Sequence, residues 1–134
     1  MSAFKKTTFL TFLLVLFLLT PARALQKNET LFFNFYYEKE SLPISSLIKN
    51  ADPAALKVKE LTGFAPKEKI GVFIAAEKKE FKKFQPKNAR VPDWAVGVAF
   101  PSENLMILLK KKNTGLAPVF RHELNHILLG QAFK

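Results

Sequence analysis

The sequence predicts an α+β domain with a small mixed sheet, an edge hairpin and helices packed on one side. Two observations predict this class. Short apolar runs alternate with segments whose apolar residues recur at helical spacing. Two of the apolar runs also flank a four-residue turn that begins at Pro101, as in a β-hairpin. The chain of 134 residues contains no visible repeat and suits one small domain.

The first half of the domain is predicted to form a strand, a helix and a second strand. Residues 30–37 are short and aromatic-rich, which is typical of a strand. The pair Asp52-Pro53 predicts the start of a helix because proline fits the first helical position. Gly63 predicts the end of that helix. Residues 69–75 form a continuous apolar run and predict a buried strand.

The second half is predicted to form a helix, a hairpin and a last helix. Residues 77–84 have the pattern of a short amphipathic helix. Residues 94–100 and 105–109 are apolar runs separated by the turn 101–104, which predicts an antiparallel pair. The last helix follows this hairpin.

The start of the chain has the composition of a secretory signal peptide. Two lysines precede an apolar run at residues 9–19, and a site of the A-x-A type ends at Ala24. We therefore expect a signal peptide at residues 1–24 and an exported domain at residues 25–134, which is periplasmic or extracellular. The apolar run is short for a membrane span, and an uncleaved N-terminal anchor is the alternative.

The chain is basic, with a formal charge of +10. Removal of Lys5, Lys6 and Arg23 with the signal peptide lowers this charge by three, to +7. The remaining lysines are scattered, which is typical of solvated surfaces and argues against a nucleic-acid groove, as does export. Contact with an anionic envelope surface stays open. The absence of cysteine excludes a disulfide framework and a thiolate metal site.

Residues 122–126 read His-Glu-Leu-Asn-His and fit H-E-x-x-H, the signature of zinc metallopeptidases. The two histidines of this motif are the only two in the chain. On a helix, His122 and His126 lie one turn apart on one face, and Glu123 lies about 100° around from His122. This spacing suits two ligands of one Zn²⁺ ion, with Glu123 placed to take a proton from an activated water. The alternative is an ordinary pair of surface histidines.

The sequence around the motif is largely apolar and predicts a helix that is buried nearly all round. Buried imidazoles need partners, which a metal ion would supply. Thr114 is the expected N-cap of this helix. Pro118 is tolerated in its first turn, where the missing N–H costs little.

Taken together, the hairpin and the motif helix resemble the peptidase MA-like family, a gluzincin branch of the zincins. The resemblance rests on residues 92–101 and 104–108 and on the motif block at residues 119–130. The strand at residues 69–75 is also similar, and the resemblance covers roughly residues 31–133. Both blocks in this order and at this spacing are fairly specific.

The resemblance implies a zincin-like fold, in which the hairpin edge strand lies along the cleft above the metal helix and pairs with an extended substrate. It implies that His122 and His126 bind one zinc ion and that Glu123 is the catalytic base. The residues around Trp94 would border the cleft, with packing in the core or at the rim as the alternative for Trp94. For Gly97, the alternative is a bulge in the strand.

The family pattern continues with a Trp-x-x-Glu-Gly-x-Ala-like block whose glutamate is the third ligand, and residues 127–134 contain no such block. Asp93 and Glu103 match no ligand position of the family. We therefore expect a peptidase domain that is truncated before the third ligand. A fragment of a longer peptidase, a degenerate inactive zincin and a site completed by a partner chain are all open explanations.

The leading hypothesis is an exported zinc metallopeptidase that hydrolyses peptide bonds in peptide or protein substrates. A zinc-activated water would attack, with Glu123 as general base. The alternative is a non-catalytic, basic exported binding module or a degenerate zincin. Nothing in the sequence indicates an oligomeric state.

Overall fold

The computed structural model of this protein describes residues 24–39 and 42–133. The predicted signal peptide, apart from Ala24, lies outside the described residues. Within these two ranges, no helix combines the length and the apolar character that crossing a bilayer requires.

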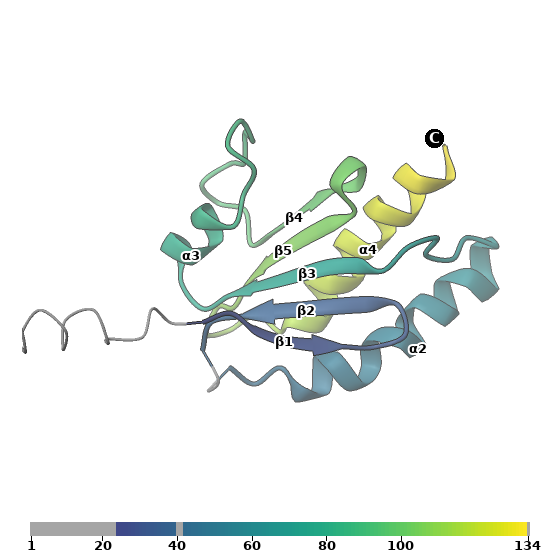
Figure 1. Cartoon of the computed structure of the whole chain (residues 1–134), viewed down its shortest axis with the longest axis horizontal. Helices are drawn as coiled ribbons and strands as arrows, with labels where there is room; N and C mark the ends of the chain where they lie inside the picture. Colours follow the sequence, from purple (N-terminus) through teal and green to yellow (C-terminus); the bar gives the residue numbers. More distant parts are fainter. Residues whose placement is uncertain (1–23, 40–41, 134) are drawn as a thin grey trace, which may run out of the picture.

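A single five-stranded mixed sheet organises the fold (Figure 1), with the strand order β1-β2-β3-β5-β4. Strands β2, β3 and β5 run parallel, and the edge strands β1 and β4 run antiparallel to their neighbours. This confirms the predicted α+β class with a mixed sheet and an edge hairpin. The strands are β1 (Gln26–Glu29), β2 (Phe33–Tyr37), β3 (Ile70–Ala75), β4 (Gly97–Phe100) and β5 (Leu105–Leu109).

Helices cover both faces of the sheet rather than one, which corrects the expectation from the sequence. Helices α2 (Ser45–Thr62) and α4 (Leu116–Ala132) pack on one face, and the short α3 (Lys78–Lys83) packs on the other. The physical reason is the alternation of side chains along a strand. On β5, Met106 and Leu108 belong to the core under α2 and α4, whereas Ile107 belongs to the core under α3.

The larger core is centred on three aromatic rings that join β2 to α4. Phe33 and Phe120 meet edge to face with their centroids 5.2 Å apart, and Phe35 stacks on Phe120 at 6.4 Å. Aromatic pairs at such distances add to the free energy gained from burying their area. These contacts hold the first half of α4 on the sheet.

The predicted strand at residues 30–37 is correct only in its second part. Residues 30–32 form a turn, and a polar strand that the sequence did not predict, β1, precedes it. The carboxylate of Asp52 holds this turn on α2. The Thr30 hydroxyl donates to it at 2.9 Å, and the backbone N–H groups of Leu31 and Phe32 donate at 2.9 and 3.1 Å.

The predicted start of α2 at Asp52-Pro53 is wrong, because the helix begins at Ser45 and contains Pro53. Leu47, Ala51 and Ala55 recur every four residues and are buried. The free energy gained by burying this face offsets the cost of a proline inside the helix. The side chain of Asp52 binds the β1–β2 turn and does not cap its own helix. Gly63 ends the helix as predicted, with φ of 78° in the left-handed region.

The elements near the hairpin agree with the sequence except at their boundaries. Helix α3 matches its prediction, and the turn between β4 and β5 is a short 3₁₀ helix, η1 (Pro101–Glu103). Strand β4 begins at Gly97 and not at Trp94, because the preceding residues form a turn in which the N–H of Ala95 donates to the carbonyl of Pro92 at 3.0 Å.

We predict that Asp52→Ala lowers the free energy of unfolding by about 2 kcal/mol, because it removes charge-assisted hydrogen bonds to a partly buried turn. Urea denaturation followed by circular dichroism measures the change. Asp93→Ala is the matched control, since Asp93 is exposed and makes one ion pair of 3.6 Å. The control should change stability by less than about 0.5 kcal/mol, and an equal loss in both variants would contradict the role of Asp52.

Candidate functional site

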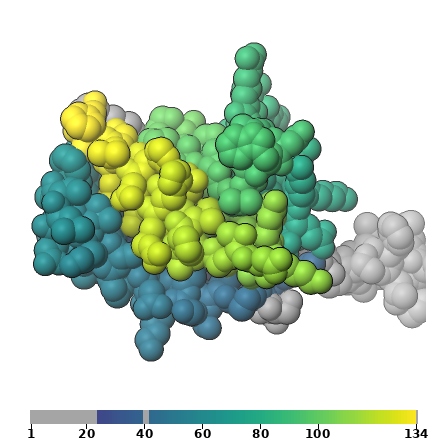
Figure 2. Space-filling model, turned by 180° about the vertical axis from the view of Figure 1, so that it is seen from behind, coloured from purple at the N-terminus to yellow at the C-terminus, as the bar shows by residue number. Residues whose placement is uncertain are grey.

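Helix α4 presents one buried face and one exposed face. Phe120, Leu124, Ile127 and Leu128 are buried against the sheet, whereas the histidines of the motif are exposed. The expectation that this helix is buried nearly all round is therefore wrong. The reason is that α4 is covered on its inner side alone, and Figure 2 shows it crossing the surface beside α2.

The predicted N-cap at Thr114 is also wrong. Gly115 is the N-cap, with an extended backbone and no side-chain hydrogen bond to the helix. Thr114 instead forms an isolated bridge with Lys111. Pro118 lies in the first turn of α4, as expected.

The two imidazoles converge at one point above α4. Their Nε2 atoms are 3.1 Å apart and their ring centroids are 4.7 Å apart. Two imidazoles bound tetrahedrally to one zinc ion would hold their nitrogens about 3.3 Å apart. The distance between His122 and His126 therefore fits two ligands of one zinc ion. Among the described residues, neither ring makes a hydrogen bond or ion pair with another side chain besides this contact.

A third ligand is not brought to this point. Across residues 24–39 and 42–133, no group of three His, Cys, Asp or Glu side chains is placed to hold a metal ion. Asp93 pairs with Lys82 at 3.6 Å, and Glu103 accepts a hydrogen bond from Ser102 at 2.6 Å. These two carboxylates thus lie in local contacts of their own and do not join the histidines.

Glu123 lies on the side of α4 that faces the sheet edge and is 7% exposed. No described residue donates a hydrogen bond to its carboxylate. Burial raises the pKa of Glu123 above its ordinary value, and the nearby His122 and His126 partly oppose this shift. The motif therefore combines two exposed imidazoles with one partly buried carboxylate.

Gly97 brings the edge strand close to this carboxylate. A Cβ atom at Gly97 would lie 2.5 Å from Val119 Cγ1 and 3.0 Å from Glu123 Oε1. The strand pairs regularly here, with Gly97 opposite Leu108, which excludes the alternative of a bulge at Gly97. The absence of a side chain at this position is what allows β4 and α4 to approach.

A hollow of about 320 Å³ opens between the start of β4 and the first turns of α4. Trp94 lines it and is 79% exposed, which excludes packing in the core and leaves a place at the rim of the hollow. The remaining surface is mostly apolar, with one imidazole and one carboxylate. Its lining residues are Trp94, Ala95, Val96, Gly97, Pro118, Val119, His122 and Glu123.

The other end of α4 is fixed by residues that sequence reasoning missed. A Cβ atom at Gly130 would overlap the ring of Pro101, so this glycine lets the helix touch the hairpin turn. The buried Gln131 amide donates to the side chain of Asn104, whose own amide donates to the Lys69 carbonyl at 2.6 Å. The only signal in the sequence is a glycine inside a helix, which often marks a close contact.

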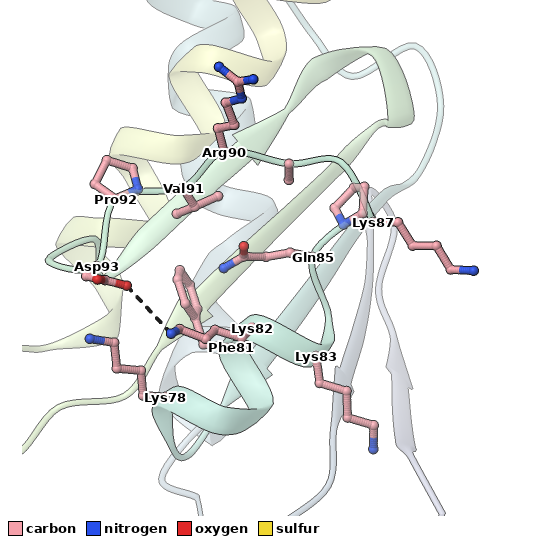
Figure 3. Close-up of a pocket in the computed structure, with 12 residues that line it drawn as sticks. Lys78, Phe81, Lys82, Lys83, Gln85, Lys87, Arg90, Val91, Pro92 and Asp93 are labelled. Atoms are coloured by element: carbon pink, nitrogen blue, oxygen red, sulfur yellow. Dashed lines mark ion pairs between the residues drawn. The ribbon is translucent and has the colours of Figure 1, made fainter.

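A larger hollow of about 520 Å³ lies beside α3 and the loop that follows it (Figure 3). Its interior is formed by Phe81, Gln85 and Val91, and neither histidine nor Glu123 lines it. The smaller hollow is therefore the candidate site, because His122 and Glu123 of the motif line it.

We predict that Gly97→Ala lowers the free energy of unfolding by about 1–3 kcal/mol, because the new methyl group overlaps Val119 and crowds Glu123. The double variant with Val119→Ala should lose less than the sum of the two single changes, as measured by urea denaturation. Gly71→Ala, in the interior strand β3, is the control, since its Cβ would make contacts of 3.6 Å or more. A loss in the control as large as in Gly97→Ala would contradict the close contact.

The chain matches no protein-family model, no curated protein and no solved structure.

Proposed function

We propose that this protein is an exported zinc metallopeptidase of the peptidase MA-like, zincin type, which hydrolyses peptide bonds in peptides or proteins. The H-E-x-x-H motif, the position of the edge hairpin beside it and the signal-like composition of residues 1–24 support the proposal.

One observation carries this proposal: two converging imidazoles stand beside the mostly covered carboxylate of Glu123, which lines the hollow and has no hydrogen-bond donor among the described residues. Burying a carboxylate without such a donor costs stability. Carboxylates with a raised pKa, held in a hollow beside other titratable groups, concentrate at sites of chemistry. Glu123 therefore fits a catalytic role better than a structural one.

Each residue of the motif has a distinct part in the proposed reaction. His122 and His126 hold zinc through their converging Nε2 atoms. When bound, zinc supplies a positive charge that polarises the scissile carbonyl and lowers the pKa of a water molecule. Glu123 accepts the proton of the attacking water and delivers it to the leaving amine. Its raised pKa suits both transfers, because a general base works best with a pKa closer to the operating pH.

The free edge of β4 supports an extended peptide as the substrate. β4 is the outermost strand of the described sheet and pairs with β5 on one side only. A peptide that adds to its other side would gain backbone hydrogen bonds. Because Gly97 lies against Glu123, such a peptide would pass next to the carboxylate.

We predict that His122→Ala and His126→Ala each weaken zinc binding by more than about tenfold. Removing a residue that only orients a metal ligand already weakens binding by about tenfold, and each of these changes removes a ligand itself. Competition with a chromogenic chelator on purified residues 25–134 measures the affinity. Asn125→Ala removes an exposed side chain between the two histidines and should leave zinc binding unchanged. Equal affinities in all three variants would exclude the histidine pair as the zinc site.

We predict that Glu123→Gln lowers the rate of peptide hydrolysis by about 10²- to 10⁴-fold, because the amide accepts no proton from water. The assay uses fluorogenic peptides and zinc-loaded protein, and the zinc content of the variant should equal that of the unchanged chain. Glu80→Gln is the control, since Glu80 is a buried glutamate on α3. Hydrolysis that continues at an unchanged rate in Glu123→Gln would contradict a catalytic role of Glu123.

A degenerate zincin or a non-catalytic exported binding module is the second candidate. It is favoured by the absence of a third ligand among the described residues, because catalytic zinc normally has three protein ligands and one water. The two experiments separate the candidates. A chain that binds zinc through both histidines but gives no hydrolysis that depends on Glu123 is a degenerate zincin, and a chain that binds no zinc is a binding module.

A further inference from the structure

Four exposed lysines gather at one end of the sheet. Two of them begin α3 and two follow β5. The backbone N–H of Lys110 donates to the carbonyl of Ala75 at 2.9 Å, which joins the segment after β5 to the end of β3. We call this group the lysine-rich end; it consists of Lys78, Lys79, Lys111 and Lys112.

The topology of the sheet brings these lysines together. Because β2, β3 and β5 run parallel, their last residues Tyr37, Ala75 and Leu109 lie at the same end of the sheet, where the parallel strands finish. β1 runs antiparallel to β2 with Gln26 opposite Tyr37, so the chain also enters the sheet at this end. In Figure 1 this is the left end of the molecule, and in Figure 2 the segments of α3 and of residues 110–115 lie at the right end.

The carboxylates described near this end of the sheet already have ion-pair or hydrogen-bond partners. Glu38 and Glu77 pair with Lys83 and Lys39 at 2.8 and 2.7 Å, and Glu80 is buried and accepts a backbone hydrogen bond. In the described part of the chain, no carboxylate forms an ion pair with any lysine of the lysine-rich end. Their positive charge is therefore available to an external anion.

The hollow next to α3 does not gather cations around a small ligand. Figure 3 shows the side chains of Lys83, Lys87 and Arg90 pointing away from the hollow in different directions. Lys78 and Lys82 lie on the side of Asp93, and the carboxylate of Asp93 pairs with Lys82 at 3.6 Å. A compact phosphate site needs donors that converge on one point. Dispersed, outward-pointing cations suit an extended anionic surface instead.

The chain before β1 points to a bilayer as that surface. An apolar run occupies residues 9–19, and only residues 20–25 separate it from Gln26. Six residues span at most about 20 Å when fully extended. As long as residues 1–24 stay attached and the apolar run lies in a membrane, the end of the sheet at which the chain enters is therefore within reach of the lipid headgroups. After cleavage, only the charge of the lysine-rich end remains to hold the domain at that surface.

We propose that the lysine-rich end binds the surface of an anionic phospholipid bilayer and turns this end of the sheet toward the lipid. This contact is independent of the proposed hydrolysis. Each lysine close to an anionic surface increases partitioning about fivefold, and screening by salt removes the effect.

The test uses residues 25–134, which contain the whole sheet and both hydrophobic clusters but not the apolar run. The protein is sedimented with vesicles of phosphatidylcholine alone and with vesicles that also contain phosphatidylglycerol. We expect binding to the anionic vesicles only, and loss of that binding in high salt. Lys78→Gln/Lys79→Gln and Lys111→Gln/Lys112→Gln should each weaken it by about 25-fold.

The matched control is Lys57→Gln/Lys59→Gln, which removes the same charge from exposed positions on the second half of α2, toward the opposite end of the sheet. Near-unchanged binding in this control would support the lysine-rich end as the contact. Equal weakening by all three double variants would overturn the proposal, because net charge alone would then explain binding. Equal binding to neutral vesicles, or complete displacement by trace soluble polyphosphate, would overturn it as well.

Discussion

The site depends on one steric constraint, which is the close approach of α4 to the β4–β5 hairpin. Two glycines permit it: Gly97 on the strand faces Val119, and Gly130 on the helix faces Pro101. Because these contacts lie near opposite ends of α4, they fix both the distance and the direction of the helix along the hairpin. The rotation of the helix then decides which side of the motif meets the sheet edge and which side meets water.

That rotation divides the motif into two environments. The imidazoles are exposed to solvent, and the carboxylate of Glu123 is mostly covered but lines the hollow beside β4. A buried carboxylate without a donor weakens the fold, and natural proteins keep such costly groups mainly where activity needs them. The aromatic contacts of Phe120 with β2, one turn before Glu123, lie beside this weak point.

The sequence predicts elements whose signal is local and fails where distant contacts decide. The strands β3 and β5 and the turn between β4 and β5 were predicted because apolar runs and turn residues are local patterns. Strand β1 was missed because it is polar and exists through its pairing with β2. At α2, Asp52-Pro53 imitates a helix start, while the true N-cap, Ile44, makes no capping bond. The motif predicted the candidate site, but its solvent exposure follows from tertiary packing. Gly130 signals a close contact at the end of α4, yet neither it nor the sequence around Gly97 reveals which residues are the partners.

The free side of β4 has a consequence for the behaviour of the protein in solution. At the other edge of the sheet, β1 carries Lys27 and Glu29, whose charges discourage another strand from adding there. β4 reads Gly-Val-Ala-Phe and carries no charge, so it can template the strand of a second copy and start aggregation. Its length of four residues and the proline that follows it, Pro101, limit how far such self-association can extend.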